Sequence, residues 1–250
     1  MRHLLRVLCL LGMLSVTTPA HAEKLRLVAD IWPPFTDASM DQGGLATAIV
    51  KAALERAGFA SDFEQVPWAR ALMGIGDGRY DVLVNAWYND SRTRIGQFSD
   101  GYLTNRIRLL KRKADALRYE RLSDLYPHTI AVVRDYAYST EFDTDHRLQK
   151  VPVRSFAVGI GMLAAGRVGM AVEDEYVARW FLQREPETVR EQIGFFGKPV
   201  SENSLHILVS LKNPQHEQIV AGFDRAIGEM KADGSYARIL QQYSFMPASP

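Results

Sequence analysis

The chain has 250 residues, with 30 basic and 29 acidic side chains, so its formal net charge is only +1. A nearly neutral chain argues against a nucleic-acid-binding protein, which favours a basic face. Beyond the N-terminal segment, no apolar stretch approaches the roughly 20 residues that a membrane-spanning helix needs. The length suits one large domain or two small ones.

The N-terminal segment has the three parts of a secretory signal peptide. Arg2 and Arg6 give a positive start, residues 4–16 are nearly all apolar, and Ala20-His21-Ala22 matches the small-x-small cleavage pattern. We therefore expect residues 1–22 to be a cleaved signal peptide and the mature protein to be soluble in the periplasm. A retained membrane anchor is the alternative, although the apolar run is short for a span of about 20 residues.

The only cysteine, Cys9, lies inside this apolar run. Its loss with the signal peptide would leave the mature chain without a disulfide and without a cysteine-ligated metal. The histidines of the mature chain have no spacing typical of a metal site; they are His128, His146, His206 and His216. We therefore expect neither a metal nor a cofactor.

After this segment, strand-like and helix-like stretches alternate, which is typical of an α/β protein. Gly58 is placed to end a helix and Pro67 to open one. The expected strands cover residues 25–29, 63–66, 80–86, 106–110, 129–133, 168–172 and 205–211. The expected helices cover residues 44–57, a stretch that begins at 67, 156–165, 174–182, an apolar stripe over 219–230, and 235–243.

Four short motifs lie in this alternating chain, in a fixed order. They are Trp32-Pro33-Pro34-Phe35, Gly78-Arg79-Tyr80-Asp81-Val82, Arg92 followed six residues later by Phe98-Ser99-Asp100-Gly101-Tyr102, and Asp233-Gly234-Ser235-Tyr236. Each motif is weak by itself, but their order and spacing resemble those of the periplasmic solute-binding proteins of family 3, which serve polar amino-acid importers. The resemblance covers nearly all of the mature chain.

The resemblance implies a type II periplasmic-binding-protein fold, in which two α/β lobes are joined by two crossing hinge strands and a ligand cleft lies between them. One lobe would comprise residues 23–104 and 206–250, and the other residues 105–205. The resemblance also implies an amino-acid-like small ligand and, as partner, the membrane permease of an ABC importer. We expect a monomer that binds no nucleic acid.

Arg92 is the first candidate for a ligand contact. In the family that the chain resembles, the matching arginine holds the α-carboxylate of the ligand. A guanidinium suits this role because its planar fork of donors pairs with both oxygens of a carboxylate. The alternative is a surface arginine in the polar loop 89–94, and Arg94 competes for the same role.

Asp174 is the second candidate. The matching aspartate of the family accepts hydrogen bonds from the α-ammonium of the ligand, so that Arg92 and Asp174 would together recognise a zwitterion. The alternative is a helix N-cap, where acidic residues are also favoured. Glu173 and Glu175 are possible substitutes.

Aromatic residues supply further candidates. Trp32 matches an aromatic residue that covers the ligand side chain in the family, although a tryptophan beside two prolines could equally belong to the core. Trp68 and Arg70, at the start of a predicted helix, could also face the cleft.

The loop that contains Asn85, Trp87 and Tyr88 departs from the family pattern, because the stretch from Asp81 to Arg92 is one residue shorter than usual. Asn89 also replaces the usual threonine. In the family, backbone groups of this loop bind the ligand, and here its aromatic side chains could stack on the ligand instead.

A second departure lies at residues 134–138, where the family has a glycine followed by serine or threonine. This chain has Arg134-Asp135-Tyr136-Ala137-Tyr138. A cleft lined by aromatic residues predicts a larger or ring-bearing ligand; these residues are Trp32, Trp87, Tyr88, Tyr136 and Tyr138.

We expect binding without catalysis. Some members of this fold are similar to dehydratases that act on cyclic amino-acid precursors, and an acidic residue among Glu173, Asp174 and Glu175 could serve as the acid of such an enzyme. A ligand sensor for a membrane receptor is another alternative, since one fold carries unrelated functions.

Overall fold

The computed structural model describes residues 24–243, so the expected signal peptide lies outside the described residues. Its strands form one mixed nine-stranded sheet in the order β2-β1-β3-β9-β5-β8-β6-β7, with β4 paired to β9. The strands are β1 (Leu25–Ala29), β2 (Ser61–Gln65), β3 (Val82–Trp87), β4 (Gly96–Phe98), β5 (Leu103–Arg112), β6 (Thr129–Val133), β7 (Gln149–Val153), β8 (Met170–Asp174) and β9 (Ile193–Ser210).

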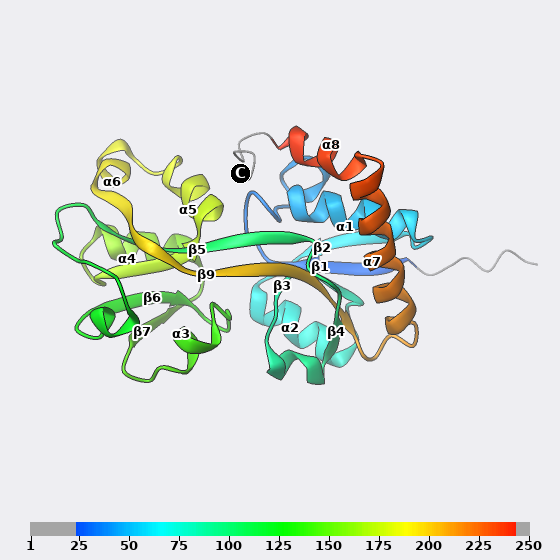
Figure 1. Cartoon of the computed structure of the whole chain (residues 1–250), viewed down its shortest axis with the longest axis horizontal. Coiled ribbons are helices and arrows are strands. Elements are labelled where there is room, and N and C mark those ends of the chain that lie inside the picture. Colours follow the sequence, from blue (N-terminus) through cyan, green and yellow to red (C-terminus); the bar gives the residue numbers. More distant parts are fainter. Residues whose placement is uncertain (1–23, 244–250) are drawn as a thin grey trace, which may run out of the picture.

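Helices cover both halves of this sheet (Figure 1). The α-helices are α1 (Leu45–Arg56), α2 (Trp68–Asp77), α3 (Thr140–Thr144), α4 (Phe156–Ala164), α5 (Glu175–Leu182), α6 (Glu187–Gln192), α7 (His216–Ala232) and α8 (Ser235–Gln242). The 3₁₀ helices are η1 (Asp41–Gly43), η2 (Asp90–Arg94) and η3 (Leu122–Leu125).

Two strands join the halves of the molecule. β5 and β9 run side by side through its middle (Figure 1), and their antiparallel register extends from the pair Leu103–Leu205 to the pair Arg112–Ile193. β1, β2, β3 and β4 lie on one side of this junction, and β6, β7 and β8 lie on the other. The lobe borders at residues 104/105 and 205/206 remain our proposal.

The first lobe is built from both ends of the described chain. β9 carries the chain back from the second half, after which α7 and α8 pack near α1 (Figure 1). The parallel strands β1 and β3 have helices on both faces, which explains why Leu27, Val28, Val82 and Leu83 are all fully buried.

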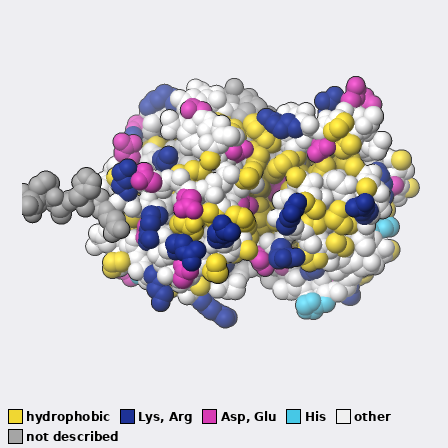
Figure 2. Space-filling model, turned by 180° about the vertical axis from the view of Figure 1, so that it is seen from behind, with side chains coloured by type: hydrophobic (Ala, Val, Ile, Leu, Met, Phe, Trp, Pro, Cys, Tyr) yellow, Lys and Arg dark blue, Asp and Glu magenta, His cyan; other side chains and the backbone are white. Residues whose placement is uncertain are grey.

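The border between the lobes carries apolar surface. The space-filling view from behind shows two bulges with hydrophobic side chains gathered where they meet (Figure 2). Between residues 24 and 243, no helix combines the length and the hydropathy required to cross a membrane.

Candidate functional site

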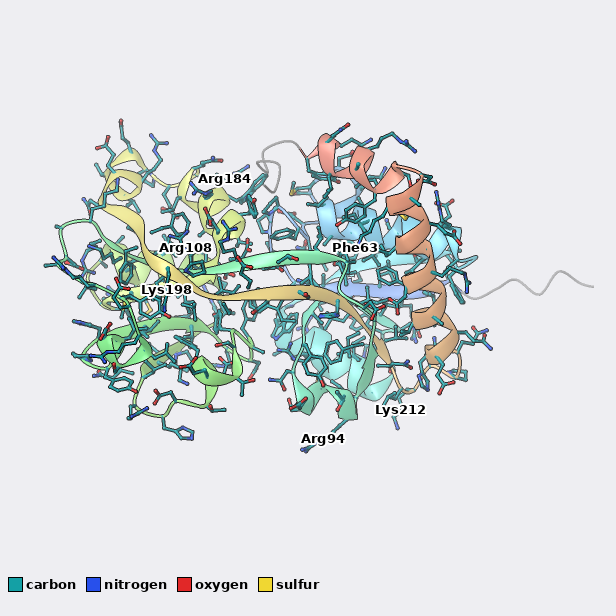
Figure 3. The ribbon with its side chains drawn as sticks, in the orientation of Figure 1. Phe63, Arg94, Arg108, Arg184, Lys198 and Lys212 are labelled. Atoms are coloured by element: carbon teal, nitrogen blue, oxygen red, sulfur yellow. The ribbon has the colours of Figure 1, made fainter. Side chains whose placement is uncertain are left out.

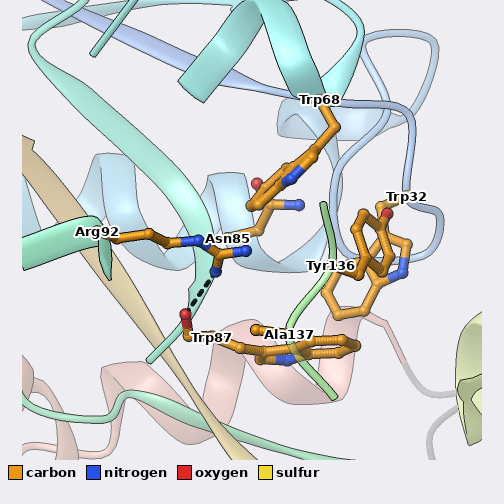
Figure 4. Close-up of a pocket in the computed structure, with 7 residues that line it drawn as sticks. All are labelled: Trp32, Trp68, Asn85, Trp87, Arg92, Tyr136 and Ala137. Atoms are coloured by element: carbon orange, nitrogen blue, oxygen red, sulfur yellow. Dashed lines mark hydrogen bonds between the residues drawn. The ribbon is translucent and has the colours of Figure 1, made fainter. Parts of the chain in front are cut away.

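A small cavity lies between the lobes. Its free volume is about 10 Å³, which is room for about one water molecule. A ligand therefore enters only if the surrounding side chains or the lobes move apart. The cavity is lined by Trp32, Trp68, Asn85, Trp87 and Arg92 from the first lobe and by Tyr136 and Ala137 from the second (Figure 4).

The end of β3 and the turn after it position the first-lobe side chains. Asn85 and Trp87 are two residues apart on β3 and therefore point to the same side of the sheet. Asn89 then caps η2 by accepting a hydrogen bond from the backbone N–H of Ser91 at 2.9 Å. This turn places Arg92 beside the strand end.

Arg92 reaches into the cavity between the two indoles of Trp68 and Trp87 (Figure 4). Only 6% of the residue is exposed. Its Nη1 donates to the carbonyl oxygen of Trp87 at 2.7 Å, and its Nη2 donates across the lobes to the carbonyl oxygen of Asp135 at 2.8 Å. Burial lowers the pKa of Arg92 to about 10, so the guanidinium remains charged at neutral pH.

No carboxylate among the described residues forms an ion pair with Arg92. Its recorded hydrogen-bond partners are neutral carbonyl groups, and further N–H donors of the guanidinium remain. Its competitor Arg94 is exposed and points away from the molecule (Figure 3). Arg92 is therefore the arginine that the fold brings to the space between the lobes.

Asp174 lies at the end of β8 and caps α5. Its Oδ1 accepts from the backbone N–H groups of Tyr176 at 2.8 Å and Val177 at 3.1 Å, and its Oδ2 accepts from Nδ2 of Asn105 at 3.1 Å. It does not line the cavity. It reaches the cavity only indirectly, because Oδ1 of Asn105 accepts from Nε1 of Trp87 at 2.8 Å.

Glu173, the residue before this cap, faces the other lobe. Its Oε1 accepts from Nε1 of Trp32 at 3.1 Å and from the backbone N–H of Asp174 at 2.9 Å. Its Oε2 is buried and has no hydrogen-bond partner among the described residues. Burial, assisted by the charges of Asp174 and Asp30, raises the pKa of Glu173 to about 8.

Asp30 follows β1 and occupies the same border. Its Oδ1 accepts from Nδ2 of Asn85 at 2.9 Å, and its Oδ2 accepts from the hydroxyl of Tyr136 at 2.8 Å. The Tyr136 bond crosses from one lobe to the other. Burial raises the pKa of Asp30 despite these hydrogen bonds.

The aromatic side chains form a connected group around Arg92. Trp32 stacks on Phe35 with ring centroids 4.6 Å apart and meets Trp87 edge-on at 5.4 Å. Tyr136 meets Trp68 at 5.4 Å and Trp87 at 5.6 Å, both nearly edge-on. Trp32 belongs to the hydrophobic core and also lines the cavity, and its contact with a ligand remains a prediction.

Tyr88 does not line this cavity and is 56% exposed. It borders a neighbouring groove of about 520 Å³ between the lobes, together with Tyr138 and Asp143 from the second lobe. The groove adjoins the cavity, because Trp87 and Ala137 line both.

A family model of bacterial extracellular solute-binding proteins, family 3, matches residues 25–246. The chain belongs to this family.

The L-cystine-binding protein TcyA of Bacillus subtilis (strain 168) is 24% identical to this chain over 216 residues, which cover 85% of this chain and 77% of that protein. An ancestral arginine-binding protein bound to arginine has a TM-score of 0.74 and 21% identity, covering 88% of this chain and 98% of its own. A histidine kinase sensor domain with similarity to periplasmic binding proteins reaches a TM-score of 0.77 at 18% identity, covering 89% and 96%. The predicted type II fold with two lobes is thereby confirmed.

Three residues of this family 3 site do not follow from the motifs. Asp30, Asn105 and Asp135 bond to Asn85, Trp87 and Arg92, respectively. Asp30 could have been found from the sequence, because it directly follows a predicted strand, and ligand sites in open α/β sheets lie at the carboxyl ends of strands. Asn105 and Asp135 act through contacts between distant segments, which no local pattern reveals.

Metal ligation has no basis in the described part of this family 3 protein. Between residues 24 and 243, no group of three or more His, Cys, Asp or Glu side chains is arranged to hold a metal ion.

Proposed function

We propose that this protein captures an amino-acid-like small molecule between its lobes in the periplasm and delivers it to the permease of an ABC importer. The observation that carries the proposal is the buried Arg92 guanidinium at the lobe border, whose hydrogen bonds within residues 24–243 go to carbonyl oxygens and not to a carboxylate. A ligand carboxylate would supply the counter-charge that the protein does not. The names of the relatives, which bind L-cystine or arginine, support an amino acid as the ligand.

The proposed binding is not catalytic. A dehydratase would need an acid in contact with the reacting atoms. Glu175 is held by Arg108 and Arg179 at 3.3 and 2.6 Å, Asp174 is held by the start of α5, and Glu173 bonds to Trp32. Incubation of the purified protein with arogenate or prephenate tests this point, and product formation would contradict it.

The first experiment is a thermal-shift screen across amino acids, amines and small aromatic acids, followed by calorimetry on each hit. A ligand that binds only the folded state raises the melting temperature. We expect at least one amino acid to bind, and Arg92→Ala to weaken that binding by about 30-fold or more, because one side of a buried charge pair is lost.

Arg94→Ala is the matched control, since Arg94 is an exposed arginine two residues away on the same turn. It should bind with wild-type affinity. Equal affinity of the Arg92→Ala and Arg94→Ala variants would refute the site.

A separate experiment addresses the importer. Cells that lack this protein should take up the identified ligand slowly, and wild-type protein, but not Arg92→Ala, should restore uptake. Because the fold is shared with a kinase sensor domain, unchanged uptake together with a lost transcriptional response to the ligand would favour the sensor function instead.

A further inference from the structure

The lobe border buries more acidic than basic residues. Asp30, Glu173 and Asp174 are all buried there, at 7%, 0% and 0% exposure, and Arg92 is the buried basic residue at the same border. Asp174 is committed to the start of α5 and to Asn105. Asp30 and Glu173 then remain as two buried carboxyl groups, and neither forms an ion pair with Arg92 or with another basic side chain of the described residues.

Two buried oxygen atoms at this border have no hydrogen-bond partner among the described residues. They are Oδ1 of Asn85, which lines the cavity, and Oε2 of Glu173. A buried acceptor without a partner lowers the stability of a protein, and such groups in native structures call for an explanation. A ligand that donates hydrogen bonds would satisfy the amide oxygen of Asn85, and a cationic donor would also satisfy Oε2 of Glu173 as that carboxyl group loses its proton.

Both carboxyl groups are covered by bonds that cross between the lobes. Nε1 of Trp32 donates to Glu173, and the hydroxyl of Tyr136 donates to Asp30. If the lobes separate, these two bonds must break, and both carboxyl groups lose the partners that cover them. The acceptors therefore lie where an entering ligand meets them.

The walls of the cavity suit a cation as well. The indoles of Trp32, Trp68 and Trp87 and the ring of Tyr136 surround it, and aromatic faces attract cations. Trp68 already has the Arg92 guanidinium 5.1 Å from its ring centroid.

We infer that the ligand carries a positively charged ammonium or guanidinium group on its side chain, and that Glu173, supported by Asp30 and Asn85, selects for it. This inference rests on the proposed function, in which Arg92 holds the carboxylate of the same ligand. The substrate class is then a cationic amino acid. Glu173, with its unpaired Oε2, determines the specificity.

Calorimetry on matched pairs of ligands tests the inference. The pairs are L-arginine with L-citrulline and L-lysine with L-norleucine, which differ in side-chain charge but hardly in shape. At least one cation should bind, and about tenfold or more tightly than its neutral partner, because a hydrogen bond to a charged group is strong. Glu173→Gln should remove most of this preference and leave the protein folded, since the amide fills the same space.

Glu175→Gln is the control variant, because Glu175 is two residues further and pairs with Arg108 and Arg179. It should keep the full preference for the cation. A preference that persists in Glu173→Gln would overturn the role of Glu173.

The same titrations provide a second readout. With a pKa of about 8, Glu173 is mostly protonated at pH 7, so a bound cation should displace up to about one proton. The apparent enthalpy should then differ between phosphate and Tris buffers for the wild type but not for Glu173→Gln. The groups that face Glu173 are Trp32, Asp30, Asp174, Tyr136 and Tyr138. Equal enthalpies in both buffers for the wild type would contradict the charging of Glu173.

The failure of this inference is distinct from a failure of the proposed function. If a neutral or acidic amino acid binds through Arg92 and none of the cations does, the proposed function stands and the cationic specificity falls. If no amino acid binds in the wider screen, both fall.

Discussion

At the scale of single residues, the buried carboxyl groups that we propose for ligand recognition also make stability depend on pH. Glu173 and Asp174 are fully buried neighbours at the end of β8, and burial raises their pKa values to about 8 and about 7. In the unfolded chain both groups titrate near their ordinary values of 4.5 and 3.8. The folded protein therefore holds protons that the unfolded chain releases.

The sign of the pH dependence follows from this difference. Between about pH 4.5 and pH 8 the native state binds more protons at Glu173 than the unfolded state, so the free energy of unfolding decreases as the pH rises. We expect the melting temperature of the ligand-free protein to fall from pH 5 to pH 8. In Glu173→Gln the fall in melting temperature should be smaller than in the wild type by at least about 2–4 °C. This difference corresponds to ~1 kcal/mol of unfolding free energy for a chain of this size.

Glu175→Gln serves again as the reference. Burial raises the pKa of Glu175, but its hydrogen bond and ion pair with Arg179 and the charge of Arg108 lower it by more, and the net shift is downward. Glu175 is therefore ionised across this window. Differential scanning calorimetry at several pH values should give wild-type behaviour for this variant. The same fall in Glu173→Gln as in the wild type would show that Glu173 is already ionised in the native state.

At the scale of elements, the sequence predicted most strands and helices and missed those with unusual composition. β6 was predicted over its exact range and α5 to within one residue. β7 was not predicted, because Pro152 interrupts a short polar stretch. The structure tolerates this proline because β7 is an edge strand, where one side of the backbone has no strand to pair with.

Most of β9 was also not predicted. The sequence predicts a strand only over residues 205–211, because Gly194, Gly197, Pro199 and the polar residues after them are typical of a loop. In the structure this stretch pairs with β5, with an irregular register between Ile107 and Leu109. Gly197 has a φ of 64°, and a Cβ there would lie 2.8 Å from the Tyr119 ring, so a glycine is required. The helices α3 and α6 are short and were also missed.

The start of α5 allows the two interpretations of Asp174 to be separated. Asp174→Ala removes the cap and should lower the free energy of unfolding by about 0.5–2 kcal/mol. Asp174→Ser should lower it less, since serine is a comparable N-cap. Chemical denaturation measures both effects.

Ligand affinity completes this test. We expect Asp174→Ser to lose less affinity than Glu173→Gln, because the Asp174 oxygens already bond to α5 and Asn105. A larger loss in Asp174→Ser would support the ligand contact implied by the family resemblance, and Glu173 would then be the supporting residue.

At the scale of the whole molecule, a few polar bonds join the two lobes across the border between them. The carbonyl oxygen of Asp135 accepts from Arg92 at 2.8 Å and from Nε1 of Trp68 at 3.2 Å. Tyr136 and Trp32 add the bonds to Asp30 and Glu173. A ligand that replaces these bonds would bias the equilibrium between open and closed forms by its differential affinity for the two.

Fluorescence energy transfer tests this motion. The only cysteine of the chain is Cys9, within the expected signal peptide, so dyes can be attached to a mature Arg94→Cys/Glu141→Cys variant, whose two positions are exposed and belong to different lobes. Addition of the identified ligand should increase the transfer efficiency. The same labels combined with Arg92→Ala should show no response, and an unchanged efficiency in the parent variant would argue against hinge closure.

The sequence by itself determined the α/β alternation, the family, and the individual residues of the strand ends and turns, since these depend on local periodicity and on motifs of a few neighbouring residues. Only the tertiary structure decided which of these residues meet. Arg92 and Asp135 lie 43 residues apart and Trp32 and Glu173 lie 141 apart, so their contacts depend on the packing of one lobe against the other. The same packing buries Glu173 beside an indole, whereas its neighbour Asp174 caps α5 through local bonds to residues two and three positions ahead.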